Sequence, residues 1–258
     1  MNQRTAAADG LHSNDGIYEL KFVVPDDLAE RVLAWARSHL AADPHAEAAL
    51  GDGYRVHSVY LDTIDFDTYH GRGPHGRIKY RLRRYGAETG VFLERKSKAR
   101  GLVRKRRTLV PETDLSYITG GITDRNWSGH WYQRRLHERR LAPTSQVMYE
   151  RIARVGETPE GPIRLTVDRQ LRCCPADEFN VRPFTGGVEF LIGQAIVEMK
   201  FHAAVPALFK RLIQELTLAP EGVSKYRASI EACGLATSVD HELRGARRGC
   251  SESGGRNA

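Results

Sequence analysis

The chain has 258 residues, enough for one large domain with a sizeable core. It carries 39 Lys and Arg residues against 32 Asp and Glu residues, and this net charge of +7 predicts an anionic partner. No run approaches the roughly 18 apolar residues of a membrane span, and the N-terminus lacks the apolar core of a signal peptide, so we expect no transmembrane segment.

Both ends of the chain are polar and rich in small residues. We expect disordered tails at residues 1–15 and at residues 235–258, the second rich in Arg, Gly and Ser, on either side of a single domain over residues 16–234. The cysteines show no C-x-x-C spacing, and their vicinal pair is a poor start for a structural disulfide. We therefore expect the protein in a reducing, cytoplasmic compartment. Its four cysteines are Cys173, Cys174, Cys233 and Cys250.

The N-terminal part of the domain predicts two strands with a helix between them. Residues 17–24 alternate in polarity, which places Glu19 and Lys21 on one face of a strand. A proline and two acids then open a helix that extends to about residue 42. Residues 54–62 alternate again. The histidines in and after this strand share no metal-ligand spacing and are expected at the surface or in turns: His57, His70 and His75.

The next segment, residues 77–107, holds most of the positive charge. It contains thirteen Lys and Arg residues against two acids, Glu88 and Glu94, so it carries +11 and everything else sums to about −4. In its first run the cations and the apolar residues fall on opposite parities, which is the period of a strand. These are Arg77, Lys79, Arg81 and Arg83 against Ile78, Tyr80 and Leu82.

Two arrangements explain these basic strands. One is an antiparallel sheet whose basic face meets solvent and whose apolar face is buried. The other is a closed barrel with the basic face inside and helices covering the outside. Charges two residues apart on a strand lie about 6.6–7 Å from each other, and each pair repels by ~2 kcal/mol at an effective dielectric near 20. Because three consecutive strands share this separation of basic and apolar residues, we expect the barrel, with an anion bound inside it.

The C-terminal half predicts helices and then strands. Residues 111–142 lose the two-residue period and gain aromatic residues, which indicates helices packed against a sheet, and the RRLHERR run is expected on a solvated helix face. Strands are expected at residues 146–155, 163–171 and 195–201, the last with Glu198 and Lys200 on one face. Helices are expected at residues 205–218 and after Ser224, a plausible N-cap.

Nine short segments follow one another in a recognisable order and spacing. They are YELKF, SVYLDT, RIKYRLRRYG, LERKSK, VRKRR, MYERIA, IRLTVDRQL, IVEMKF and VSKYR. Together they resemble the VTC domain, the polyphosphate polymerase domain of the vacuolar transporter chaperone family within the triphosphate tunnel metalloenzymes. The resemblance implies an α+β fold in which helices flank an antiparallel β-barrel, the triphosphate tunnel. It also implies ATP and inorganic polyphosphate as partners and Mn²⁺ or Mg²⁺ as cofactor.

Carried over position by position, the resemblance assigns tunnel cations, two neutral phosphate contacts and one metal ligand. The implied cations are Lys21, Arg81, Arg83, Lys96, Lys105, Arg151, Arg164, Lys200 and Lys225. The implied neutral contacts are Tyr149 and Ser224, and the implied metal ligand is Glu198.

The chain departs from its relatives at two places. Family members often carry a further lysine just before the S-K-Y motif, where this chain has Gly222 and Val223. The related CYTH branch, which contains tripolyphosphatases and class IV adenylyl cyclases, typically opens with E-x-E-x-K, whereas this chain has Ile17, Glu19 and Lys21. With one carboxylate fewer, we expect Lys and Arg to neutralise phosphate and Glu198 to be the lone acid among the inward cations.

The resemblance implies transfer of the γ-phosphoryl group of ATP to a growing polyphosphate chain. A triphosphate hydrolase with the same tunnel is the alternative enzyme, and a non-catalytic polyanion-binding protein is an alternative of another class. Nucleic acid is not expected, because base stacking requires aromatic side chains among the cations. Tyr80 instead shares its parity with the apolar residues.

Overall fold

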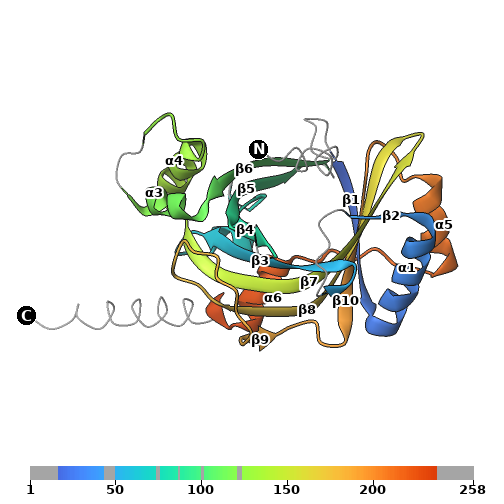
Figure 1. The fold of residues 1–258 in the computed structure, drawn as a ribbon. Coiled ribbons are helices and arrows are strands. Elements are labelled where there is room, and N and C mark those ends of the chain that lie inside the picture. Colours follow the sequence, from blue (N-terminus) through green and yellow to red (C-terminus); the bar gives the residue numbers. More distant parts are fainter. Residues whose placement is uncertain are drawn as a thin grey trace, which may run out of the picture.

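Eight antiparallel strands close into a barrel in the computed structural model, which describes residues 17–43, 50–73, 76–86, 88–99, 102–120 and 124–236. Their order is β7-β3-β4-β5-β6-β1-β10-β8, and β8 pairs with β7 again to complete the ring (Figure 1). These strands are β1 (Ile17–Pro25), β3 (Gly53–Asp62), β4 (Ile78–Tyr85), β5 (Gly90–Ala99), β6 (Leu102–Pro111), β7 (Ala142–Thr158), β8 (Gly161–Pro175) and β10 (Gln194–Phe201). Two-residue strands extend the sheet at β7 and β8, namely β2 (Ala41–Ala42) and β9 (Val188–Glu189).

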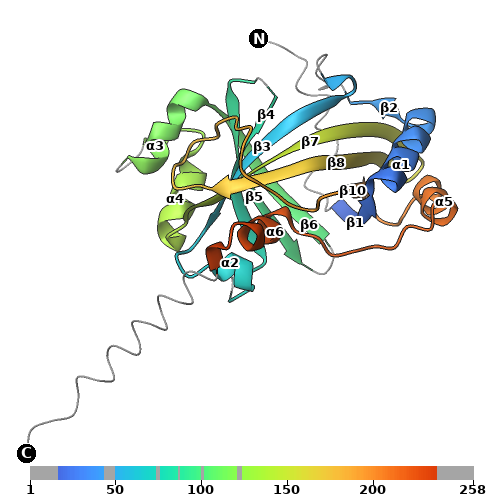
Figure 2. The same cartoon turned by 90° about the horizontal axis from the view of Figure 1, so that it is seen from below.

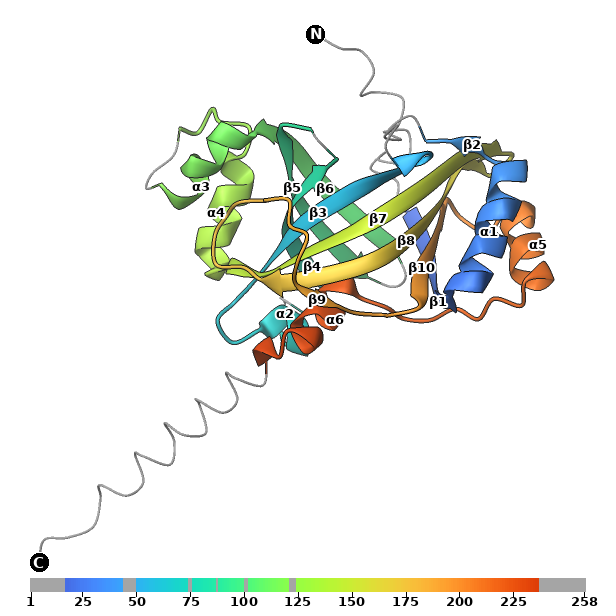
Figure 3. The same cartoon turned by 60° about the horizontal axis from the view of Figure 1, so that its bottom comes forward.

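Most of the helices cover the outside of the barrel. Figures 2 and 3 show α1 and α5 together at one end and α3 and α4 at the opposite end, while α2 and α6 lie together along a third side. The helices are α1 (Asp26–His39), α2 (Asp67–His70), the 3₁₀ helix η4 (Glu112–Leu115), α3 (Ser116–Thr119), α4 (His130–Arg139), α5 (Ala207–Glu215) and α6 (Lys225–Ala232). The α+β barrel with flanking helices is therefore confirmed.

Buried apolar side chains form three cores. In the first, Phe22 of β1 and Leu165 of β8 pack with Leu33 of α1 and Phe209 of α5 on the outer side of the barrel. The second joins β4 and β5 to α4, also on the outer side. Since the apolar parity of these strands faces α1, α5 and α4, their cationic parity faces the barrel interior, as the second of the two arrangements requires.

The third core lies on the inward faces of β3 and β7. Tyr60 of β3 pairs with Arg81 in register, and Val56 pairs with Tyr149 of β7, so these side chains share the inward parity. They pack with Tyr226 of α6, so this helix covers the inner side of the two strands.

Local signals set the ends of the helices that flank the site. Two acids, Asp26 and Asp27, occupy the first turn of α1, where the helix dipole favours negative charge. At α6 the hydroxyl of Ser224 accepts a hydrogen bond from the backbone N–H of Arg227, which confirms the predicted N-cap. This cap fixes where Lys225, the first residue of α6, enters the barrel.

Several boundaries differ from the sequence expectations. Strand β7 has 17 residues and β8 has 15, because the hairpin they form continues beyond the barrel wall. The predicted tail at residues 1–15, and residues 237–258 of the tail predicted at residues 235–258, lie outside the described residues. The first two residues of the second tail, Leu235 and Ala236, instead pack against the core with α6. Among the described residues, no helix is long and apolar enough to cross a membrane.

The expectation for His57 was wrong. This side chain lies on β3 and is 4% exposed, since helices and loops cover the outer face of that strand. Burial, together with the charges of Arg84 and Arg55, lowers the pKa of His57 to about 4. The imidazole is therefore neutral at physiological pH.

Replacing Leu165 with Ala tests the core under α1 and α5. Leu165 is 0% exposed, so the change leaves a cavity, and we expect the free energy of unfolding to fall by about 2–5 kcal/mol in urea titrations. The matched control is Ile64→Ala, at a position that is 80% exposed. This change should alter the free energy of unfolding by less than about 0.5 kcal/mol. Equal effects of the two changes would contradict this description of the core.

Candidate functional site

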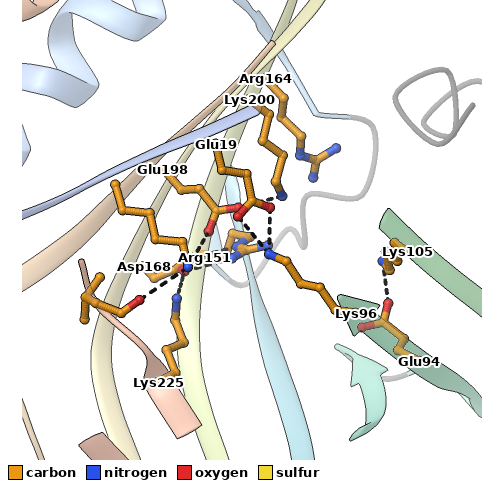
Figure 4. A network of polar contacts seen from close by, with 12 residues as sticks. Glu19, Glu94, Lys96, Lys105, Arg151, Arg164, Asp168, Glu198, Lys200 and Lys225 are labelled. Atoms are coloured by element: carbon orange, nitrogen blue, oxygen red, sulfur yellow. Dashed lines mark hydrogen bonds and ion pairs between the residues drawn. The ribbon is translucent and has the colours of Figure 1, made fainter. Parts of the chain in front are cut away.

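Charged side chains from all parts of the chain converge inside the barrel. Figure 4 shows Lys and Arg side chains from several strands and from α6 pointing toward carboxylates on β1, β5, β8 and β10. Three clusters, each centred on one carboxylate or a pair, contain the positions assigned from the sequence.

The first cluster lies where β1 pairs with β10. The antiparallel register sets Lys21 opposite Glu198 and Glu19 opposite Lys200, so the two strands place opposite charges side by side. The Nζ atom of Lys200 is 2.8 Å from Glu198 Oε1, and that of Lys21 is 3.7 Å from Oε2. From β5, Lys96 reaches across and donates to both oxygens of Glu19, at 2.7 and 2.8 Å.

The second cluster surrounds Glu94 of β5. Arg81, its register partner on β4, approaches within 2.6 Å, and Lys105 of β6 lies 2.5 Å from the other oxygen. Arg83 is 4.0 Å away and donates instead to Ser58 Oγ at 3.0 Å and to the hydroxyl of Tyr149 at 3.1 Å. Glu94 thus orients two cations from the neighbouring strands, and Ser58 and Tyr149 orient Arg83 beside them.

The third cluster surrounds Asp168 of β8. Arg151 of β7 makes a bidentate contact with it at 2.6 and 2.7 Å, a geometry that fixes the guanidinium plane. Lys225 of α6 lies 2.6 Å from the same carboxylate. Nearby, Arg164 is held by Asp43 at 2.6 Å and by the hydroxyl of Tyr54 at 3.0 Å.

All the carboxylates of these clusters are ionised at neutral pH. Burial by itself would raise the pKa of each, but the cations around them outweigh it and lower the pKa of Glu19, of Glu94 and of Glu198. Arg151 and Lys225 lower the pKa of Asp168 to about 2 against the same effect of burial. Burial also lowers the pKa of Lys96 to about 7, although Glu19 opposes the shift.

The expectation of a lone acid among the inward cations was therefore wrong. The interior holds Glu19, Glu94, Asp168 and Glu198, and the row of cations on β4 is not the bare, self-repelling row that we estimated from the sequence. The alternation in the sequence already placed Glu19 on the same strand face as Lys21, and Asp168 on the same face as Arg164. That Glu94 faces Arg81 depended on the register of β4 and β5, which the sequence does not reveal.

Four of the lysines are more exposed than the carboxylates that they contact. The side chains of Lys21, Lys96, Lys105 and Lys200 are 21–26% exposed, whereas those of Glu19, Glu94, Asp168 and Glu198 are at most 7% exposed. Three other cations, Arg83, Arg151 and Lys225, are as buried as the carboxylates. The nine assigned cations also outnumber the five carboxylates that they contact, which include Asp43. An entering anion would meet the ammonium groups of the four lysines first.

A divalent metal has two candidate ligands in this interior. Among the described residues, no three His, Cys, Asp or Glu side chains gather closely enough to hold a metal ion by themselves. Glu19 and Glu198 lie on the paired strands β1 and β10, and lysines contact all four of their carboxylate oxygens at 2.7–3.7 Å. Mg²⁺ commonly takes one or two carboxylates and completes its shell with water and substrate phosphates. The donor chemistry of this pair therefore fits Mg²⁺, which would take the place of the lysines at these oxygens.

Besides the interior acids other than Glu198, sequence reasoning missed two interior residues. Tyr60 of β3 accepts a hydrogen bond from Arg81 at 3.4 Å, and Arg81, Arg83 and Lys225 lower its pKa to about 8, although burial by itself would raise it. Lys79 of β4 donates to Ser224 Oγ at 2.7 Å. The parity of Lys79 with Arg81 was visible in the sequence, but its partner on α6 was not.

Asp168→Asn tests the third cluster through pH. Because the folded-state pKa of Asp168 is about 2, below its ordinary value of 3.8, its ionised form stabilises the fold above about pH 4, and this contribution is lost as the pH falls toward 2. The shift corresponds to about 2 kcal/mol. We expect the wild-type advantage over Asp168→Asn in urea unfolding to shrink by that amount between pH 5 and pH 2, and a constant difference would contradict this.

Comparison with known proteins agrees with this architecture. The VTC domain family matches residues 17–233. No curated protein matches the sequence.

The solved structures that resemble this chain share little sequence with it. A Bacillus halodurans protein named for a proposed adenylate cyclase activity has a TM-score of 0.49 and 12% identity, covering 81% of this chain and 94% of its own. The Hippeastrum protein HpAC1, which is described as having a dominant triphosphatase activity, has a TM-score of 0.45 and 15% identity. This match covers 84% of this chain and 96% of the HpAC1 chain. The match to the VTC domain spans most of the described barrel, from the first residue of β1 to the residue after α6, and the chain belongs to the VTC domain family.

Proposed function

We propose that the chain is an ATP-dependent polyphosphate polymerase that transfers the γ-phosphoryl group of ATP to the end of a growing inorganic polyphosphate chain. The observation that carries this proposal is the convergence of nine cations inside a closed barrel, with their carboxylates buried behind them. Such an interior suits a linear, highly charged anion, which both the donor and the acceptor of this reaction contain.

The reaction requires neither a side-chain nucleophile nor a general base from the protein. A terminal oxygen of the polyphosphate chain, already ionised at neutral pH, forms a bond to the γ-phosphorus as the bond from that phosphorus to the β,γ-bridging oxygen breaks, and ADP leaves. No proton has to be removed from the nucleophile, so no side chain has to act as a general base. Catalysis then depends on alignment and on stabilisation of the charge that spreads over the transferred group.

The clusters suggest how the side chains would divide this work. Glu94 orients Arg81 and Lys105, and Ser58 and Tyr149 orient Arg83. Asp168 fixes Arg151, so these four cations are preorganised to hold phosphate oxygens in line. When bound at Glu198 and Glu19, Mn²⁺ or Mg²⁺ would supply positive charge to the phosphates of the donor. Tyr149 and Ser224 would add neutral hydrogen bonds.

A triphosphate hydrolase is the second candidate. The observation that favours it is the pair of interior carboxylates, Glu19 and Glu198, since a two-carboxylate metal site also suits activation of water. Incubation with ATP and Mn²⁺ discriminates the candidates by product. Long polymer with ADP supports the polymerase, free phosphate with ADP supports the hydrolase, and unchanged ATP supports a binding protein.

Glu198→Gln should abolish metal-dependent turnover of ATP while preserving the fold. The amide is isosteric but carries no charge, so a divalent cation loses its principal ligand. Turnover is measured with Mn²⁺ and with Mg²⁺, and circular dichroism checks the fold. Turnover at the wild-type rate in the folded variant would remove Glu198 from the metal site.

Arg83→Gln should weaken binding of tripolyphosphate, as measured by titration calorimetry. A hydrogen bond to a charged group contributes about 1.5–3 kcal/mol, so we expect the dissociation constant to rise roughly 10- to 100-fold. The control is Arg134→Gln, which makes the same charge change on the exposed face of α4 and should have little effect. Similar losses in both variants would point to nonspecific attraction by net charge.

A further inference from the structure

Lys79 occupies an unusual electrostatic position in the barrel interior. It lies two residues before Arg81 on β4 and shares the inward parity of Arg81 and Arg83. Its Nζ atom donates to Ser224 Oγ at 2.7 Å, across 145 residues of sequence. This contact joins β4 to the first turn of α6.

The other interior lysines each have a carboxylate partner. Their Nζ atoms lie 2.5–3.7 Å from a carboxylate oxygen, and these lysines are Lys21, Lys96, Lys105, Lys200 and Lys225. Within the described part of the chain, Lys79 has no carboxylate at ion-pair distance, and its hydrogen-bond partner is a neutral hydroxyl.

The groups that face Lys79 do not compensate its charge. They are Lys21 on β1, Arg81 on β4, Lys96 directly opposite on β5, Arg227 on α6 and the phenol of Tyr60 on β3. Burial, aided by Lys21, Arg81 and Arg227, lowers the pKa of Lys79 to about 8. A mostly buried ammonium among other cations is unfavourable in the empty protein, and an anion placed there would relieve it.

We propose that Lys79 and Ser224 form a phosphate-binding subsite of the barrel interior, at its boundary with α6, that takes one phosphate group of a linear condensed phosphate. The inference rests on the proposed function only for the class of ligand. It gives a role to a lysine outside the set that we carried over from the family.

The segment before Ser224 carries no cation of its own. Gly222 and Val223 stand just before Ser224. The backbone carbonyl of Val223 is 3.5 Å from Lys21 Nζ, so the segment contributes an acceptor there. The cation beside Ser224 is Lys79, which comes from β4.

Strand geometry indicates that the ligand is a chain. Arg83, Arg81 and Lys79 occupy every second position of β4, and each step is about 6.6–7 Å. The three cations therefore span roughly 13 Å along the strand. A single orthophosphate meets only one of them, whereas a condensed phosphate that follows the strand meets all three in turn.

Titration calorimetry with tripolyphosphate and with a longer polyphosphate tests the subsite. Lys79→Met keeps the length of the side chain and removes the charge, and we expect the dissociation constant for the longer chain to rise roughly tenfold or more. Lys79→Arg should keep affinity within a few-fold. The control for charge is Arg134→Gln on α4, which should match the wild type.

A pH series separates a phosphate contact from a structural role. The ammonium of wild-type Lys79 titrates near pH 8 in the free protein, so affinity for the longer chain should fall between pH 7 and pH 9. The guanidinium of Lys79→Arg stays charged, and its affinity should fall less. The pKa of Lys96 is about 7 and those of Tyr60 and Tyr85 are about 8, so these groups titrate in the same range in both proteins. Only the difference between the two pH slopes therefore reports on Lys79, and the comparison is repeated in a Tyr60→Phe background.

The outcomes decide the proposal. Wild-type affinity in Lys79→Met, or equal pH slopes for wild type and Lys79→Arg, would overturn the subsite. If Arg83→Gln still weakens binding in that case, the proposed function is untouched. A lower melting temperature of ligand-free Lys79→Met would assign a structural role instead, whereas the loss of an uncompensated cation predicts an equal or higher one.

Discussion

Buried carboxylates behind a layer of cations are the interaction on which the barrel interior depends. Glu94 holds cations from β4 and β6, Asp168 holds cations from β7 and α6, and Glu19 with Glu198 ties β1, β5 and β10 together. Removing one partner from such a buried pair leaves an uncompensated charge, which typically destabilises by about 3–5 kcal/mol. The interior is thus part of what holds the strands in register.

The same arrangement prepares the interior for a ligand. Because the carboxylates are almost fully buried and the lysine tips are partly exposed, the charge that an entering molecule meets is positive. A phosphate chain must nevertheless compete with the carboxylates for these cations. The competition is most direct at Lys96, whose ammonium group donates hydrogen bonds to both oxygens of Glu19. Sites where a cation has no carboxylate to release, such as Lys79, would bind phosphate without that competition.

The outer cores and the inner charges constrain each other through strand alternation. On β4, Tyr80 and Leu82 face α4 and the core beneath it, so Arg81 and Arg83 must face inward. A shift of one residue in register would bury the arginines under the helix and expose the apolar side chains to the interior. The hydrophobic cores therefore fix the geometry of the charged site, even though no apolar residue has to contact the ligand.

The sequence by itself determined most of the strands, the separation of their cationic and apolar residues onto opposite faces, and the family, because these depend on local periodicity and on the order of short motifs. That the cationic faces point inward was an expectation, which the packing of the apolar faces against α1, α4 and α5 confirmed. It also marked most of the residues that meet inside the barrel. Only the tertiary structure decided how their charges are balanced. The pairing of Arg81 with Glu94 follows from strand register, and the contact of Lys79 with Ser224 joins residues 145 positions apart, so neither leaves a periodic signal along the chain.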